Sequence, residues 1–215
     1  MYLMKPRFEI LSFPEQMLEQ LELYGRVCYK SEDRISEGSA ERFVRMLVHT
    51  YQHESVIEHC NITVKFIVDR GVSHELVRHR LCSFSQESTR YCNYTKKGVI
   101  FIIPPWVNVP EGEFTHDTVS TTNTDDEWFD AMLRAETSYK YLMENGWTAQ
   151  QARSVLPNSL KTEVVTTANL REWRHILKLR TAKTAHPQMR EVMVPLLLAF
   201  QQRLPVIFDN IGIGG

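Results

Sequence analysis

The chain has 215 residues, and its 25 lysines and arginines are balanced by 26 aspartates and glutamates, which gives a formal net charge of −1. This balance argues against a general nucleic-acid or anionic-membrane binder, because such proteins carry an overall basic excess. Hydrophobic residues make up 43% of the chain and aromatic residues 10%, which excludes disorder and is sufficient for one core. We expect a single domain over residues 1–215, with a frayed tail at about 211–215.

The cysteines and the hydropathy pattern point to an intracellular protein. The four cysteines form no C-x-x-C pair, which predicts reduced thiols and no metal site. The first residues lack the apolar segment of a signal peptide, and the longest apolar runs are far shorter than the roughly 20 residues of a membrane span. We therefore expect a soluble cytoplasmic protein with no membrane partner.

Apolar periodicity predicts the elements of the N-terminal half. Pro14 suits the first turn of a helix, and Ser39 is a candidate N-cap for the next one. Residues 61–68 alternate apolar and polar side chains, as in a half-buried strand. A polar segment separates the last two elements of this half, from about residue 82 to residue 94. In chain order we expect a helix over 14–29, a helix over 39–51, a strand over 61–68, a helix over 73–81 and a strand over 99–103.

The C-terminal half contains clearer helix signals. Two motifs fit capping boxes, Thr148-x-x-Gln151 and Asn169-x-x-Glu172, and Gly146 is a helix stop. We expect a loop over 110–126, a helix over 126–145, a short helix over 148–157, a strand over 163–167, a helix over 169–182 and a helix over 187–204. Helices outnumber strands without strict alternation, so the fold class is α+β or irregular α/β.

Arginines concentrate where the chain is otherwise polar. The 16 arginines outnumber the 9 lysines, and every Lys or Arg position from Arg70 to Arg90 is an arginine. Guanidinium groups bind phosphate and carboxylate bidentately. The segment 78–90 also contains hydroxyl and amide side chains among its arginines. A solvated loop is one interpretation, but the clustering favours an anion-binding loop.

A second cluster lies on the helix expected over 169–182. Arg171, Arg174, His175 and Lys178 share one face, at about 100° per residue. Arg180 falls on the opposite face, within the apolar stripe of Trp173, Ile176 and Leu177. A guanidinium there needs a partner, because an unpaired buried charge is costly. Either Arg180 makes an internal salt bridge to an acid such as Glu136 or Glu163, or it faces a ligand in a closed pocket.

Other catalytic and cofactor motifs are missing from the sequence. His53 and His59 are six residues apart, which does not fit the H-E-x-x-H geometry of a helical zinc site. The nine glycines form neither a G-x-G-x-x-G motif nor a P-loop, so side chains would have to hold any nucleotide. No G-x-S-x-G motif surrounds Ser88, so it is better interpreted as a phosphate-binding hydroxyl than as a nucleophile.

The arginine-rich segment resembles a known family. Residues 78–90 match in full the R-H-R-x-x-S-x-x-x-x-S-x-R signature of flavin-dependent thymidylate synthases. The similarity extends to His53-Glu54-Ser55 and Glu58-His59 upstream, and to Arg153, Asn169-Leu170-Arg171 and Arg180 downstream. Six fixed positions at fixed spacing make this signature specific, and the similarity covers nearly the whole chain.

The resemblance implies a fold and an activity. The fold would be α/β, with a central, mostly antiparallel sheet flanked by helices, assembled as a homotetramer with active sites at subunit interfaces. The enzyme would be a methyltransferase that converts dUMP to dTMP. It would take the carbon from 5,10-methylenetetrahydrofolate and the reducing equivalents from NADPH through FAD, and release tetrahydrofolate.

The resemblance also assigns site residues by position. The residues matching FAD contacts are Ser55, Arg78, His79, Arg80, Gln86, Asn169, Arg171 and His175. Those matching dUMP contacts are Glu75, Arg78, Gln86, Glu87, Ser88, Thr89, Arg90, Arg153 and Arg180. Arg180 matches the activating arginine, which would stabilise negative charge on the uracil ring as N3 ionises. Ser88 would be a nucleotide ligand, since flavin chemistry replaces a protein nucleophile in this family.

Three positions differ from the residues most common in the family. Gln86 replaces a Glu, with the acid shifted to Glu87, whereas Glu75 replaces a Gln and His175 replaces an Asn. Two alternatives to dTMP synthesis stay open at this point. One is a non-catalytic nucleotide- or RNA-binding module that uses the same arginines. The other is a flavoenzyme with a different product, such as hydroxymethylated dUMP.

Overall fold

A computed structural model of the protein describes residues 1–96, 98–115 and 124–214. The chain forms two compact units, each assembled from three segments. Unit 1 contains residues 1–7, 66–78 and 85–165, and unit 2 contains residues 8–65, 79–84 and 166–215. The single domain expected from the sequence stays a prediction.

The strands form two sheets, and the mixed α/β class is confirmed. The three-stranded sheet has the order β5-β1-β6, in which β1 pairs parallel with β5 and antiparallel with β6. The four-stranded sheet has the order β2-β3-β7-β4. The strands are β1 (Tyr2–Met4), β2 (Arg7–Ser12), β3 (Asn61–Asp69), β4 (Ser83–Gln86), β5 (Ile100–Ile102), β6 (Gly112–Glu113) and β7 (Lys161–Asn169).

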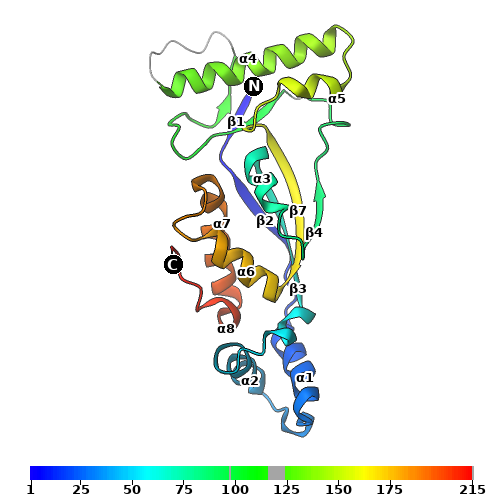
Figure 1. The fold of residues 1–215 in the computed structure, drawn as a ribbon, viewed down its shortest axis with the longest axis vertical. Helices are drawn as coiled ribbons and strands as arrows, with labels where there is room; N and C mark the ends of the chain where they lie inside the picture. Colours follow the sequence, from blue (N-terminus) through cyan, green and yellow to red (C-terminus); the bar gives the residue numbers. More distant parts are fainter. Residues whose placement is uncertain (97, 116–123, 215) are drawn as a thin grey trace. The chain divides into compact units, whose positions relative to one another are not determined.

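The neighbouring strands β3 and β7 run antiparallel and continue directly into helices. The Leu170 amide donates to the Cys60 carbonyl (3.0 Å) at one end of the pair, and the Arg70 amide donates to the Leu160 carbonyl (3.1 Å) at the other. Each strand ends on an Asx residue, Asp69 or Asn169, whose side chain caps the helix that follows. The two strand–helix junctions therefore fix where α3 and α6 begin (Figure 1).

Unit 1 has its own hydrophobic core. The helices α3 (Arg70–Leu76), α4 (Thr124–Glu144) and α5 (Ala149–Ala152), with the 3₁₀ helix η5 (Arg153–Val155), belong to it. Leu3 of β1 and Phe101 of β5 are fully buried in a cluster that includes Phe129 and Leu133 of α4. In Figure 1, α4 and α5 lie side by side next to β1.

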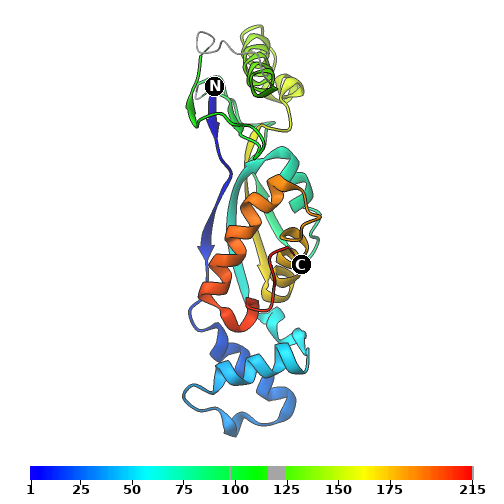
Figure 2. The ribbon, with the colours of Figure 1, turned by 90° about the vertical axis from the view of Figure 1, so that its left-hand side faces the viewer.

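Unit 2 is mainly helical. It contains α1 (Met17–Tyr29), η1 (Glu32–Arg34), α2 (Ser39–Arg45), the π-helical turn η2 (Met46–Thr50), η3 (Glu54–His59), α6 (Leu170–Arg180), α7 (Pro187–Arg203) and α8 (Pro205–Phe208). Figure 2 shows α7 leading into α8. Trp173 of α6 is fully buried, with its ring 5.5 Å from Phe200 of α7 and its indole N–H donating to the Ile62 carbonyl. Gly25 lets α1 approach α2, because a Cβ at this position would lie 2.7 Å from the Phe43 ring.

Most predicted elements are present, and the differences have local causes. The Thr148 capping box and the stop at Gly146 (φ +89°) are confirmed. Ser39 is not an N-cap, because its hydroxyl donates to the buried carboxylate of Glu22. The third helix begins at Arg70, where Asp69 caps it, and not at residue 73.

The segments expected to be irregular also contain strands. β4 lies in the polar segment, and β6 lies in the loop expected over 110–126, of which residues 116–123 fall outside the described part of the chain. The strand expected over 163–167 is longer than predicted. Within the described residues, no helix has the length and apolarity needed to span a membrane.

Candidate active site

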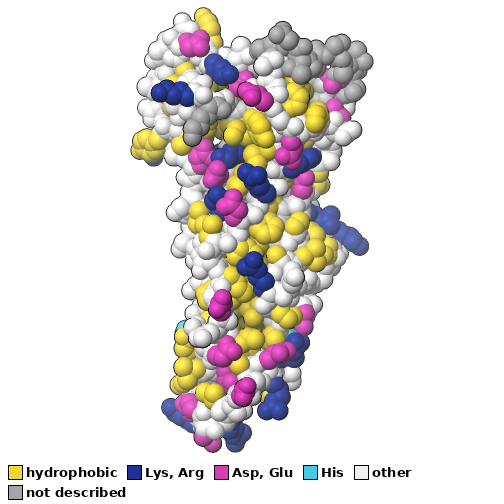
Figure 3. Space-filling model, turned by 180° about the vertical axis from the view of Figure 1, so that it is seen from behind, with side chains coloured by type: hydrophobic (Ala, Val, Ile, Leu, Met, Phe, Trp, Pro, Cys, Tyr) yellow, Lys and Arg dark blue, Asp and Glu magenta, His cyan; other side chains and the backbone are white. Residues whose placement is uncertain are grey.

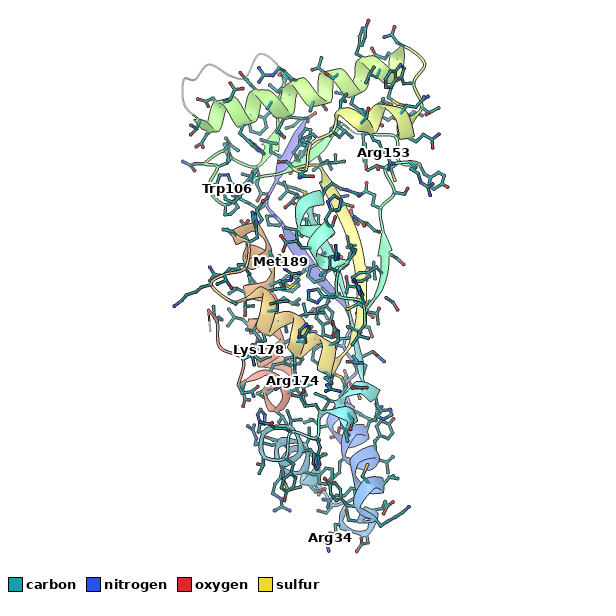
Figure 4. The ribbon with its side chains drawn as sticks, in the orientation of Figure 1. Arg34, Trp106, Arg153, Arg174, Lys178 and Met189 are labelled. Carbon is teal, nitrogen blue, oxygen red and sulfur yellow. The ribbon has the colours of Figure 1, made fainter. Side chains whose placement is uncertain are left out.

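The basic face predicted for the 169–182 segment lines a cavity in unit 2. Arg171, Arg174, His175 and Lys178 of α6 border a cavity of about 730 Å³ together with Asn169. Figure 4 labels Arg174 and Lys178 on this helix. The Asn169 side-chain carbonyl accepts the Glu172 amide (2.8 Å), so the rest of its amide group is left for a ligand.

Carboxylates occupy part of this basic face. Arg171 Nη1 lies 2.5 Å from Glu58 Oε1, and this hydrogen bond raises the pKa of the arginine. Arg174 Nε donates to Glu54 Oε1 at 3.2 Å. Lys178 makes no ion pair with any residue that the structure describes. Lys178 is therefore available to an anionic ligand, and the half-exposed Arg171 would have to share its guanidinium between Glu58 and that ligand.

Arg180 forms a hydrogen bond with a histidine. Its Nε–H donates to Nε2 of His79 at 3.0 Å, and His79 is buried, with 6% exposure. Burial, followed by the charges of Arg180 and His175, lowers the pKa of His79 from 6.5 to about 4. The ring is thus neutral at physiological pH and can accept this hydrogen bond. The two acids considered from the sequence have other partners, because Glu136 pairs with Lys140 (3.1 Å) and Glu163 with Lys161 (2.7 Å).

Glu172 and His175 complete the surroundings of His79. Glu172 Oε1 lies 3.6 Å from His79 Nδ1, and the His175 ring lies edge-on at 5.9 Å. His79, Glu172 and His175 bring one possible metal-ligating atom each within 4.8 Å of one another. The neighbouring Arg180 cation already uses one lone pair of His79 and would repel a metal ion. The expectation of no metal site stays a prediction.

The nucleotide candidates of unit 1 gather around β4 and the start of β7. Gln86 donates from Nε2 to the Ser73 hydroxyl at 3.0 Å and to the Thr162 hydroxyl at 3.3 Å. Arg70 Nη1 reaches the same Thr162 hydroxyl at 3.3 Å. These bonds fix the Gln86 amide, so its carbonyl oxygen is the atom left for a ligand.

Both oxygens of Glu87 are engaged. Tyr94 donates its hydroxyl to Oε1 at 2.9 Å, and Lys161 Nζ lies 3.1 Å from Oε2. Burial and the Glu87 charge raise the pKa of Tyr94, so the phenol stays a proton donor. These three side chains border a cavity of about 330 Å³ within unit 1.

A second cavity of unit 1, of about 440 Å³, is bordered by Arg70, His74, Thr89 and Arg153. Arg153 Nη1 donates to the buried Thr89 hydroxyl at 2.9 Å, and Figure 4 shows Arg153 just after α5. Ser88 lies in the turn that precedes Arg90, and its hydroxyl accepts the Arg90 amide at 3.3 Å. Within the cavity, the guanidinium groups of Arg70 and Arg153 beside the Thr89 hydroxyl form a suitable environment for a phosphate.

The exposed arginines of the signature lack carboxylate partners. Among the described residues, neither Arg78 nor Arg80 makes an ion pair or a side-chain hydrogen bond, and Arg90 only stacks on Tyr91. Of the remaining candidates, Ser55 is exposed on η3 and Glu75 is partly buried on α3. Arg78 belongs to unit 1, whereas His79 and Arg80 belong to unit 2.

Sequence reasoning missed some residues of these sites. Arg70 and His74 were not assigned, although Arg70 belongs to the arginine cluster of the sequence. Glu172 was interpreted only as a capping residue, but its carboxylate faces His79. Tyr94 and Lys161 gave no sequence signal, because only folding brings them to Glu87.

The residues present fit an anionic dinucleotide. The cavity of unit 2 offers one unpaired lysine, a partly exposed arginine and the Asn169 amide, which is the donor set that a diphosphate requires. Its volume is within the usual range of ligand pockets, roughly 300–1,000 Å³.

Comparisons with known proteins give a consistent result. The model of one family, described as "Thymidylate synthase complementing protein", matches residues 9–206. A flavin-dependent thymidylate synthase of Geobacter sulfurreducens is 30% identical over 200 residues, which cover 89% of this chain and 81% of that protein.

Two solved structures are also similar. A UMP/dUMP methylase, PolB from Streptomyces cacaoi bound with 5-Br dUMP, has a TM-score of 0.75 and 26% identity, and the match covers 97% of this chain and 96% of the other. Thymidylate synthase X from Helicobacter pylori, with FAD and dUMP, has a TM-score of 0.76 at 19% identity, covering 96% and 98% of the two chains, and it bears on the fold alone. Taken with the intact signature, the family match over residues 9–206 places this chain in the family of flavin-dependent thymidylate synthases.

Proposed function

We propose that this protein is a flavin-dependent thymidylate synthase that methylates dUMP to dTMP with bound FAD. Its co-substrates are 5,10-methylenetetrahydrofolate and NADPH, and its product besides dTMP is tetrahydrofolate. The observation that carries the proposal is the complete signature, whose arginines Arg78, Arg80 and Arg90 have no carboxylate partner among the described residues. Guanidinium groups without a carboxylate partner are suited to binding anionic ligands.

The chain's own residues divide into two groups in this proposal. In unit 2, Arg171, Asn169 and His175 border the cavity that would hold the flavin dinucleotide, with Ser55, His79 and Arg80 as further contacts. In unit 1, Gln86 and Glu87 are held in fixed orientations for the base and sugar of dUMP, and Arg90, Arg153, Ser88 and Thr89 supply donors for its phosphate. Arg78 and Gln86 would contact both ligands, and Glu75 would contact dUMP.

Arg180 has the electrostatic role. Its guanidinium stabilises the negative charge that develops on the uracil ring as N3 ionises, and the partly buried position strengthens this interaction. When bound, FAD supplies hydride transfer, which reduces the transferred carbon to the methyl level with electrons that come from NADPH. Ser88 orients the nucleotide and does not act as a nucleophile. The active unit is a homotetramer whose sites lie at subunit interfaces.

A ribonucleotide substrate is the second candidate. The similar PolB structure belongs to a methylase of both UMP and dUMP. The nucleotide cavities of this chain contain several hydroxyl and carboxylate groups that could accept a 2′-hydroxyl, among them Glu87. UMP therefore belongs in every substrate assay.

One anaerobic assay tests the function. Purified protein supplied with FAD should be yellow and should lose its flavin colour when NADPH is added. With methylenetetrahydrofolate and dUMP, mass spectrometry should then detect dTMP, and parallel reactions contain UMP. A colourless protein that takes up no FAD contradicts the proposal, and a hydroxymethylated product corrects the reaction class.

A further inference from the structure

We propose that Glu172 and His79 are positioning residues, which together hold the Arg180 guanidinium in the orientation that the reaction needs. This proposal rests on the catalytic role proposed for Arg180. The three side chains all belong to unit 2, and two of them lie on α6.

The proton on His79 has a defined position. A guanidinium nitrogen is always a donor, so the 3.0 Å bond from Arg180 Nε requires a lone pair on His79 Nε2. A neutral imidazole then carries its proton on Nδ1. The geometry therefore selects one tautomer of His79.

The other ring nitrogen of His79 faces a carboxylate. His79 Nδ1 faces Glu172 Oε1 at 3.6 Å, and both side chains are buried, with 5% and 9% exposure. A carboxylate is only an acceptor, so it favours an N–H on the side of the ring that faces it. Glu172 thus selects the same tautomer that Arg180 requires, and it also limits rotation of the ring.

Glu172 and Arg180 lie at opposite ends of α6. Glu172 lies in the first turn of α6 and Arg180 is its last residue, so their backbones are about 12 Å apart along the axis. His79 comes from a distant segment and bridges the two side chains. Arginine loses considerable rotamer entropy when it is fixed, and this bridge fixes it before any ligand binds.

The charges around the ring are consistent with a neutral acceptor. The groups that face His79 are Arg180, His175 and Glu172. Burial, followed by the electrostatic effects of Arg180 and His175, lowers the pKa of His79 to about 4, and burial raises the pKa of Glu172. Cys82, close to Glu172, remains an uncharged thiol because burial and that carboxylate raise its pKa to about 12.

The first test does not depend on activity. In the apo protein labelled with ¹⁵N-histidine, the resonances of His79 are assigned by their loss in His79→Gln. We expect the Nδ1–H tautomer in the wild type over about pH 6–8, and a mixture of tautomers in the double variant Glu172→Ala/Arg180→Ala, in which neither neighbour selects a ring nitrogen. A proton on Nε2 in the wild type, or an unchanged tautomer in the double variant, overturns the proposal.

The second test is a double-mutant cycle on the holoenzyme, with the single-turnover rate of dTMP formation as the readout. Glu172→Ala should lower this rate about tenfold when Arg180 is present, but less than about twofold in the Arg180→Lys background, because lysine lacks the Nε–H that His79 accepts. FAD content and the KM for dUMP should stay within about twofold of wild type. A tenfold loss in both backgrounds contradicts the positioning role.

Conservative and control variants separate a positioning role of Glu172 from a structural one. Glu172→Gln keeps an acceptor oxygen toward Nδ1 and should retain at least about half of the rate, whereas Glu172→Met replaces Ala if the smaller side chain prevents folding. Glu22→Gln, at a buried glutamate of the same unit, should leave the rate unchanged. A wild type that forms no dTMP rejects the proposed function, and the tautomer measurement then still decides the positioning proposal.

Discussion

At the scale of single residues, the central contact is that between Arg180 and His79. The sequence placed a cation in an apolar stripe and predicted that it needs an anionic partner or a ligand. One partner that the structure provides is a neutral imidazole, which accepts a hydrogen bond from Arg180 without neutralising its positive charge.

The first prediction concerns removal of this charge. We expect Arg180→Ala to lower kcat about 10²–10³-fold, because it removes the group that stabilises the developing anion. Flavin content and thermal stability should change little, since Arg180 is only partly buried. Arg134→Ala, at an exposed arginine paired with Glu127, is the matched control. Wild-type turnover in Arg180→Ala would show that the arginine is structural.

The second prediction concerns pH. The pKa of His79 is about 4 in the folded protein and 6.5 in the unfolded chain, so between these values the unfolded chain binds more protons. Stability therefore rises with pH over this range, and it is lost as the pH falls from 6.5 toward 4. Crossing the whole range corresponds to at most about 3 kcal/mol of unfolding free energy.

The measurement is urea unfolding of wild type and His79→Gln between about pH 4 and 7. The free energy of unfolding of wild type should fall more steeply with acidification than that of the variant. Parallel curves would mean that His79 is not held neutral by the fold.

At the scale of elements, two strand–helix junctions position the candidate ligands. β3 ends at Asp69 and β7 at Asn169, and each side chain accepts an amide three residues further on, from Val72 and Glu172, at 2.8 Å. The caps have nearly the same backbone angles, with φ −75° and −73° and ψ 167° at both. Because the cap sets the first turn of α6, it sets where Arg171 and His175 lie.

The third prediction tests this junction. Asn169→Ala should lower the free energy of unfolding of the apo protein by about 1 kcal/mol, whereas Asn169→Asp keeps an accepting oxygen and should be nearly neutral. Denaturant unfolding of both variants measures the difference. Equal stability of Ala and Asp at this position would contradict the capping role.

At the scale of the whole molecule, the signature is divided between the two units. Arg78, Ser88 and Arg90 belong to unit 1, whereas His79 and Arg80 belong to unit 2. Most dUMP candidates lie in unit 1 and most flavin candidates in unit 2. Basic and acidic side chains are interspersed on the visible face of each unit (Figure 3), which is unlike the one-sided basic surface of a nucleic-acid binder.

The fourth prediction follows from this division. Arg171→Ala should weaken FAD binding only and Arg153→Ala dUMP binding only, each by about tenfold, whereas Arg78→Ala should weaken both. Titration of each ligand into each variant measures these effects. If Arg78→Ala affects only one ligand, the shared role assigned to it is wrong.

The sequence alone determined the features that depend on local order. Helix caps, apolar alternation and the spacing of the signature are set by neighbouring residues, so the helix and strand pattern, the basic face of α6 and the family could be predicted. The structure differs from the predicted elements where a group distant in the sequence forms a contact. Ser39, for example, donates its hydroxyl to Glu22 and does not act as an N-cap.

Only the tertiary structure decided which side chains meet. No sequence pattern could pair Arg180 with His79, Glu172 with the same ring, or Tyr94 and Lys161 with Glu87, because these contacts join segments that folding brings together. The near-zero net charge of the chain likewise says nothing about which side chains meet. It excluded a polyanion surface, but it is a sum over the chain, whereas a binding site depends on which cations the fold leaves unpaired.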